Sequence, residues 1–191
     1  MPCAHGRRAE PRRAPEAIAV QLYQRLLGAS FERLPPALRR FHAQGGGEAE
    51  CRFAVRRHAG PLHGLVARAA GLPAVTPSTR VALHVRVHGE QEFWTRTFRD
   101  RSLRTVQWLE RGRLVEQSGP VQVAFDVTAD ESGMRITSCG CRVFGVPLPR
   151  ALGPTVTATA HGAPNGWEVE VTIGVPLLGT IGGYGGTVVP A

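Results

Sequence analysis

The hydrophobic pattern of the chain changes near Thr79. After this residue, apolar side chains recur at every second position, as in segments 81–87, 121–127 and 167–175. A period of two places alternate side chains on opposite faces of a strand, so each segment predicts a strand with one buried face. Turn signals separate these segments, at Gly89-Glu90, Arg111-Gly112, 130–133 and Asn165-Gly166.

Residues 79–191 therefore predict an antiparallel sheet with no helix between its strands. We expect a meander of about eight to nine short strands. A sheet of this length curls strongly or closes, which hides its edges and creates a concave interior. The glycine cluster at 179–186 lacks the Lys-Ser/Thr pair of a phosphate-binding loop and predicts a bent closing strand. Pro147, Pro149 and Pro154 predict an exposed loop between two strands.

The pattern before Thr79 is different. Apolar residues recur there every three or four positions, which predicts two to three short helices between residues 15 and 78. Proline opens these segments and glycine closes them, as is typical of helix ends. A short strand over residues 51–55 also fits the pattern. The predicted helices cover residues 15–28, 36–42 and 62–70. The fold class is thus mainly β (α+β), with one domain over residues 15–191.

The net charge of +8 raises the question of anionic partners. All 23 basic residues are Arg, and 13 of them lie in residues 1–80, against five acidic residues. Residues 81–191 carry ten of each sign. The excess thus belongs to the helices and to residues 1–14, an Arg-rich segment without periodicity that we expect to be a disordered tail. Because no groove-reading motif accompanies it, we expect no specific binding of nucleic acid.

Localisation and metal chemistry can be judged from the cysteines and the apolar runs. No signal-peptide stretch follows the Arg-rich start, so we expect a cytoplasmic protein with reduced thiols. No run approaches the roughly 18 apolar residues of a membrane span. Alternation places Cys139 and Cys141 on one strand face, but structural zinc normally needs two more spaced ligands. We expect no metal and no cofactor.

The most informative segment for function is 94–98, in which Trp94, Arg96 and Phe98 share one strand face. A two-residue turn before this strand places Arg96 opposite Leu83, on the apolar side of the sheet. An arginine inside a protein needs a carboxylate partner, because an unpaired buried charge costs several kcal/mol.

The candidate partner is Glu116. The turn at Arg111-Gly112 places it opposite Gln107 and next to apolar pairs, on the same face of the sheet. The alternative is that Arg96 lies at the rim of the barrel and only stacks on Trp94, since buried charges are rare. The sequence leaves both arrangements open.

Six segments in this order resemble the bacterial domain of unknown function 4166 family, from about residue 18 to the end of the chain. They are LYQRLLGASFERLPPALRRFH, GLPAV, EFWTRTF, LVEQSGPVQVAFDV, GVPLPRALGP and GGYGG. The family has no established activity. The resemblance therefore implies no activity. It implies only that similar domains occur fused behind nucleotide-binding, oxidoreductase-like modules.

The function expected from these observations is a binding module whose curled sheet holds an apolar or amphipathic acid. Two alternatives stay open: an enzyme that uses Arg96, Glu116 and Tyr184 on a small substrate, and an accessory domain that docks on an oxidoreductase-like partner through its basic helices. The sequence does not decide whether the protein is an enzyme. The candidate ligand-binding residues are Trp94, Arg96, Phe98, Glu116 and Tyr184.

Overall fold

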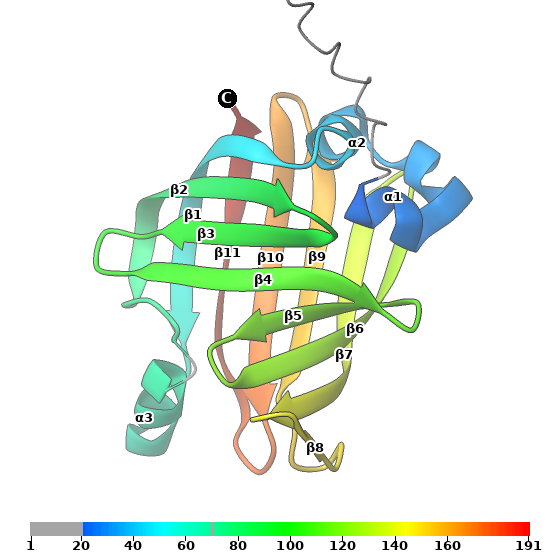
Figure 1. Ribbon diagram of the computed structural model, residues 1–191. Coiled ribbons are helices and arrows are strands. Elements are labelled where there is room, and N and C mark those ends of the chain that lie inside the picture. The colour runs from blue at the N-terminus through cyan, green and yellow to red at the C-terminus, as the bar shows by residue number, and fades with distance from the viewer. Residues whose placement is uncertain (1–20, 70) are drawn as a thin grey trace, which may run out of the picture.

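Eleven strands make up most of the computed structural model, which describes residues 21–69 and 71–191 (Figure 1). All of them belong to one antiparallel sheet. The strands are β1 (Gly47–Arg57), β2 (Thr76–His88), β3 (Gln91–Thr97), β4 (Ser102–Glu110), β5 (Arg113–Ser118), β6 (Val121–Asp130), β7 (Gly133–Val143), β8 (Val146–Leu148), β9 (Thr155–Ala163), β10 (Gly166–Val175) and β11 (Gly179–Pro190).

The sheet closes into a barrel of ten strands. Each strand pairs with the next along the chain, except that β9 pairs with β7, and β8 is a short side strand on β7. The barrel closes where β11 pairs with β1 over Ala49–Arg57. The predicted meander and its closing strand are thus confirmed. The number of strands was underestimated, partly because Pro147 concealed β8, whose position outside the barrel allows a proline.

Short helices cover parts of both barrel ends. The segment before β1 contains α1, a 3-10 helix and α2, which contact β4, β6, β9 and β10 at one end. The helix between β1 and β2, α3, contacts β1 and β11 at the opposite end (Figure 1). The helices are α1 (Leu22–Leu27), the 3-10 helix (Gly28–Arg33), α2 (Pro36–Ala43) and α3 (Pro61–Ala69).

The helix predictions agree with these elements where the structure describes the chain. Gly28 ends α1 with a φ of 53°, and Pro36 opens α2. The region 15–78, predicted to be mainly helical, also contains all eleven residues of β1. The 51–55 strand was therefore real but too short in the prediction. Residues 1–14, the predicted tail, lie outside the described residues, as does the start of the first predicted helix.

Aromatic and aliphatic side chains pack against one another in two regions of the inner face of the barrel. Beneath α2, Phe41 packs on Trp167 with ring centroids 5.1 Å apart and on Trp94 at 6.3 Å. Further along the barrel, Tyr184 packs on Phe53 at 5.5 Å and on Phe98 at 6.0 Å. Strand alternation delivers every one of these strand residues to the interior, so the period-two pattern specifies the core.

Glycines let β11 approach its neighbours closely enough to complete the barrel. Gly186 has a φ of +148°, and a Cβ there would overlap the carbonyl oxygen of Arg52 on β1. On the other edge of β11, a Cβ at Gly183 would overlap the carbonyl oxygen of Val171 on β10. The glycine cluster is therefore a structural requirement of closure, as the sequence predicted.

Replacing Gly186 by Ala is expected to destabilise the fold by about 2–3 kcal/mol, because the new Cβ meets backbone at a positive φ. Gly64→Ala, in α3, is the matched control: nothing lies within 4 Å of the place that its Cβ would occupy, so stability should be unchanged or rise by up to about 1 kcal/mol. Urea denaturation of both variants measures the difference, and equal stability would contradict the role given to Gly186.

Candidate functional site

The hairpin formed by β2 and β3 has the predicted register. Val85 pairs with Trp94 and Leu83 with Arg96. Leu83 and Val85 are buried core residues, so Arg96 shares the inner face of the barrel with them. Across the next hairpins, Gln107 pairs with Glu116, as predicted, and this pair also faces inward.

Arg96 makes three contacts inside the barrel. Its Nη1 donates to Oγ1 of Thr105 at 3.2 Å and lies 3.7 Å from Oε1 of Glu116. Its Cζ lies 5.1 Å from the centroid of the Trp94 ring. The guanidinium therefore faces the predicted carboxylate and also stacks on the tryptophan, so stacking accompanies the contact with Glu116 and does not replace it.

The ion pair of Arg96 and Glu116 is not sealed from solvent. Their side chains keep 16% and 24% of their surface accessible, and their separation of 3.7 Å is long for a charge-assisted hydrogen bond. Burial alone would lower the pKa of Arg96, but the neighbouring Tyr184 and Glu116 outweigh it and raise this pKa. The guanidinium stays charged, and these contacts use few of its five N–H donors.

A row of polar side chains crosses three strands next to this pair. Glu92, Gln107 and Glu116 are direct neighbours on β3, β4 and β5. The Tyr23 hydroxyl, from α1, donates to Oε1 of Gln107 at 3.0 Å, and Nε2 of Gln107 donates to Oε2 of Glu116 at 3.1 Å. Helix and sheet are thus joined by a continuous hydrogen-bonded chain that ends at Glu116, whose Oε1 lies 3.7 Å from Nη1 of Arg96.

Glu92 is the most deeply buried acid of this row, with 1% of its surface exposed. Nε1 of Trp94 donates to its Oε2 at 3.0 Å, while its Oε1 has no partner among the described residues. Burial raises the pKa of Glu92 to about 7, although the hydrogen bond from Trp94 opposes the shift. Near neutral pH this carboxyl is thus divided between its neutral and charged forms.

The sequence analysis missed Glu92, Gln107 and Tyr23. The signal for Glu92 was present, because it lies four residues before Arg96 in the same strand and therefore on the same face. Gln107 was identified only as the position opposite Glu116. The contribution of Tyr23 depends on how α1 docks on the barrel, which no local pattern encodes.

Aromatic and imidazole rings close the barrel above the polar row. His42 on α2 stacks on Tyr23 at 4.0 Å and lies 6.0 Å from the Trp94 ring. Burial lowers the pKa of His42 to about 3 and raises that of Tyr23. Both rings are therefore neutral at physiological pH, and the helical end of the barrel contributes hydrogen-bonding groups rather than charges.

The remaining candidates, Phe98 and Tyr184, lie further along the same interior. Tyr184 on β11 packs on Phe98 and contributes to the electrostatic environment of Arg96. Burial raises the pKa of the Tyr184 hydroxyl, and burial also raises that of the Cys51 thiol to about 12. The structure thus brings all five predicted residues to the inner face of one barrel.

Part of the inner face stays accessible although the wall of the barrel is closed. The inward-facing side chains of β9 and β10 include Val156, Val169, Val171 and Ile173, which are all only half-buried. Inner surface that remains accessible behind a closed wall indicates that side chains do not fill the interior completely. This apolar surface and the Arg96–Glu116 pair both lie on the inner face of the barrel.

The two strand cysteines do not share a face, contrary to the sequence prediction. A bulge opposite Ala124 and Phe125 adds one residue to β7. Cys141 is consequently buried in the core, whereas Cys139 lies half-buried with its Sγ against the carbonyl oxygen of Ala124. Among residues 21–69 and 71–191, no group of three potential metal ligands comes together.

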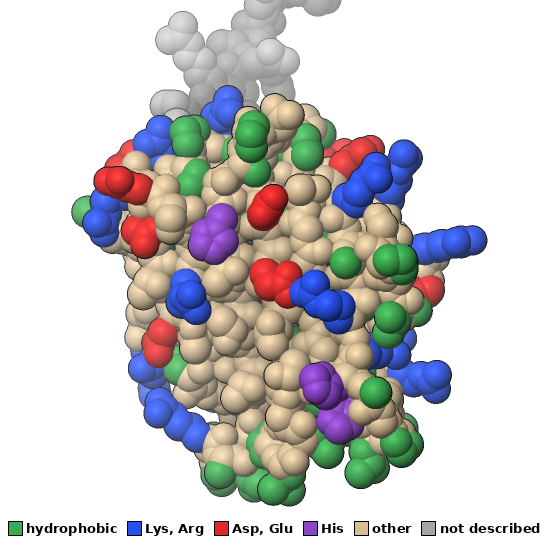
Figure 2. Space-filling view, turned by 180° about the vertical axis from the view of Figure 1, so that it is seen from behind, with side chains coloured by type: hydrophobic (Ala, Val, Ile, Leu, Met, Phe, Trp, Pro, Cys, Tyr) green, Lys and Arg blue, Asp and Glu red, His purple; other side chains and the backbone are tan. Residues whose placement is uncertain are grey.

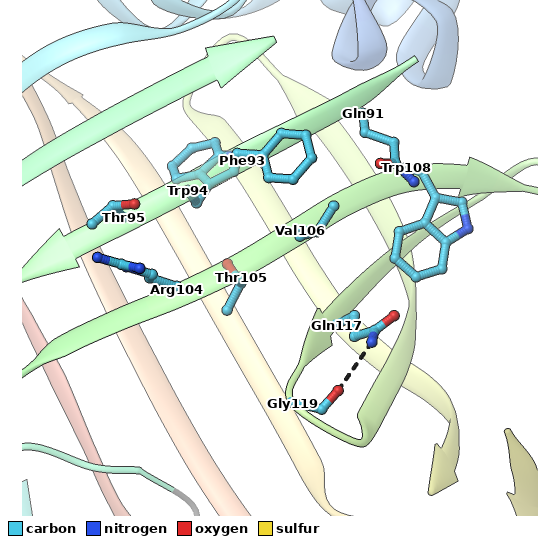
Figure 3. A pocket seen from close by; sticks show the side chains of 10 residues that line it. All are labelled: Gln91, Phe93, Trp94, Thr95, Arg104, Thr105, Val106, Trp108, Gln117 and Gly119. Atoms are coloured by element: carbon cyan, nitrogen blue, oxygen red, sulfur yellow. Dashed lines mark hydrogen bonds between the residues drawn. The ribbon is translucent and has the colours of Figure 1, made fainter. Parts of the chain in front are cut away.

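A separate depression of about 460 Å³ lies on the outer face of β3 and β4 (Figure 3). Phe93 and Val106, neighbours across these strands, form its apolar floor, and Gln91 and Gln117 line it further. Of the predicted residues, Trp94 alone borders it. Because Arg96, Glu116 and Tyr184 do not line this depression, it is distinct from the candidate site.

The fold and the site together define a closed antiparallel β-barrel with a buried polar row and one inward-facing arginine. The chain matches the domain of unknown function DUF4166 over residues 34–188, and it belongs to that family. No curated protein and no solved structure matches it. Within the described residues, no helix is long and apolar enough to cross a membrane.

Glu92 is expected to make stability fall as the pH rises. Its pKa is about 7 in the folded protein and about 4.5 in the unfolded chain, so the folded state holds the proton more tightly. Stability from this group is complete below the unfolded pKa and decreases through the folded pKa. Between pH 5 and 8 the loss should be about 2–3 kcal/mol.

Glu92→Gln is the control for this effect, because an amide keeps the acceptor for Trp94 and does not titrate in this range. Urea denaturation of both proteins at several pH values measures the difference. An identical pH dependence of the two proteins would show that Glu92 is not the titrating group.

The pair of Arg96 and Glu116 is expected to be energetically coupled. Arg96→Met keeps the packing of the stem but leaves Glu116 without its cation, at a cost of about 2–3 kcal/mol. The double change with Glu116→Gln should restore more than half of this loss, and a double-mutant cycle in urea measures the coupling. The exposed pair of Arg25 and Glu90 serves as the control, with little expected coupling. Additive effects of the two interior changes would refute the coupling.

Proposed function

We propose that the barrel binds a small apolar or amphipathic acid, with its carboxylate at Arg96. The observation that carries this proposal is the contact pattern of the guanidinium. It lies inside the barrel, keeps 16% of its side-chain surface accessible and meets Glu116 only at 3.7 Å. An arginine with unused N–H donors beside accessible apolar surface suits an anionic head group with an apolar body.

The apolar part of such a ligand would lie against β9 and β10, where Val171 and Ile173 face inward and remain half-buried. Tyr184 would lie near the head group, since it and Arg96 perturb each other's pKa. Its protonated hydroxyl is a hydrogen-bond donor to a carboxylate. The proposed site therefore combines one charge, one hydroxyl and an apolar wall.

The state of the ionisable groups favours binding over acid–base catalysis. The hydroxyls of Tyr23 and Tyr184 and the thiol of Cys51 have raised pKa values because of burial, and the imidazole of His42 has a lowered one. All four are neutral at pH 7, and none is a ready base or nucleophile, since the imidazole is only a weak base at a pKa of about 3. Glu92 titrates near neutrality but is 1% exposed, so a substrate does not reach it.

The experiment compares a long-chain carboxylic acid with the alcohol of the same length, titrated against the purified protein by calorimetry. Arg96→Met should weaken binding of the acid by about 10- to 100-fold, the loss of a charge-assisted hydrogen bond. Binding of the alcohol should change by less than about threefold, because it lacks the charge.

Arg86→Met is the matched control, since Arg86 is an exposed residue of the neighbouring strand β2 and should leave both affinities unchanged. Circular dichroism of each variant confirms that the barrel is intact. Equal losses for acid and alcohol, or no binding of either by the unmodified protein, would refute the proposed site.

A further inference from the structure

Exposed apolar side chains gather at one end of the barrel. Ten large hydrophobic residues of the described chain are exposed, and seven of them lie in the connections between barrel strands, including α3 and β8. Three of these lie between β1 and β2, three between β7 and β9, and one between β10 and β11. They are Leu62, Leu65, Val75, Phe144, Val146, Leu152 and Leu177.

These three connections lie at the same end of the molecule. In an antiparallel meander, alternate connections share an end, so the loops after β1, β3, β5, β7 and β10 lie together, opposite α1 and α2. We call these connections the loop end. Seen from behind, Figure 2 shows apolar side chains along the lower edge of the molecule and beside α3. Leu177 is fully exposed, and Phe144 is 83% exposed.

The charges at the loop end have one dominant sign. Four exposed arginines lie in its connections, against a single acid, Asp100. The carboxylate of Asp100 accepts a hydrogen bond from the backbone of Ala74 at 3.2 Å. The four exposed arginines of the loop end are Arg68, Arg99, Arg101 and Arg150. The opposite end is also basic, because its helices carry four arginines against Glu32 and its turns carry Arg111 against Glu90 and Glu131. The loop end is therefore distinguished by the combination of its arginines with exposed apolar side chains.

A basic groove of about 440 Å³ lies beside α3 at this end. Arg56, Arg57 and His58 line it together with Thr180 and the exposed Val75. Arg56 pairs with Glu170, and the Arg57 guanidinium donates to the carbonyls of Leu72 and Pro73. The Nε of Arg57 is buried and has no partner among the described residues.

We infer that the loop end docks on an anionic lipid bilayer. Apolar side chains at the tips of separate loops suit insertion between lipid head groups, and the surrounding arginines suit their phosphates. Charge complementarity favours an anionic bilayer as the partner, because the loop end carries four arginines and one acid and the bilayer surface is uniformly negative. The inference does not depend on ligand binding inside the barrel.

The test measures sedimentation of the protein with vesicles of phosphatidylglycerol and phosphatidylcholine, and with vesicles of phosphatidylcholine alone. Binding should be at least about tenfold stronger to the anionic vesicles and should weaken as salt increases. A triple variant should bind the anionic vesicles at least about tenfold more weakly; it combines Leu62→Ser, Leu65→Ser and Phe144→Ser. These residues are exposed, so the fold should survive, which circular dichroism checks.

Val87→Ser with Phe93→Ser is the matched control, since these residues are exposed on the barrel wall outside the loop end. This variant should bind vesicles within about twofold of the unmodified protein. Equal loss in both variants, or equal binding to neutral and anionic vesicles, would overturn the inference. A dimer in light scattering that only the loop-end variant abolishes would assign the surface to a second copy of the chain and would likewise overturn it.

Discussion

Closure of the sheet between β1 and β11 is the constraint on which the interior depends. Without it, β1 and β11 would be edge strands with unpaired backbone groups, and the half-buried residues of β9 and β10 would face bulk solvent. Closure requires that two backbones approach at Gly186, where any side chain would collide with Arg52. The glycine-rich C-terminal strand is therefore what turns a curled meander into a lumen that holds charged groups.

Inside that lumen, the electrostatics follow from the order of the strands. Adjacent strands place Glu92, Gln107 and Glu116 side by side, and Gln107 separates the two carboxyls. Burial moves the pKa of Glu92 to about 7, so its charge is reduced near neutrality and the pair of Arg96 and Glu116 remains as the main charge balance. The proposed anionic ligand would share the guanidinium with Glu116, and the long 3.7 Å contact leaves N–H donors of Arg96 free for it.

The sequence predicted those features that depend on strand period and turn length. The positions of Arg96 opposite Leu83 and of Glu116 opposite Gln107 both followed from two-residue turns, and both are confirmed. Features that break the period were missed: the bulge in β7 moves Cys139 off the face of Cys141, and β8 lies within a proline-rich segment. Contacts between helices and sheet, such as Tyr23 with Gln107, could not be predicted because they require the docked tertiary structure.

The two barrel ends differ in a way that bears on access to the lumen. At the helical end, Tyr23 and His42 are each 2% exposed and pack against the polar row, so that end is closed by well-packed rings. Arg96 lies near the opposite end of β3, one residue before the final paired position of that strand. The connections beyond it carry seven of the ten exposed large apolar residues and four arginines against one acid. An amphipathic acid taken from a bilayer would enter at the end that we infer to face the lipid, which is also the end of β3 at which Arg96 lies.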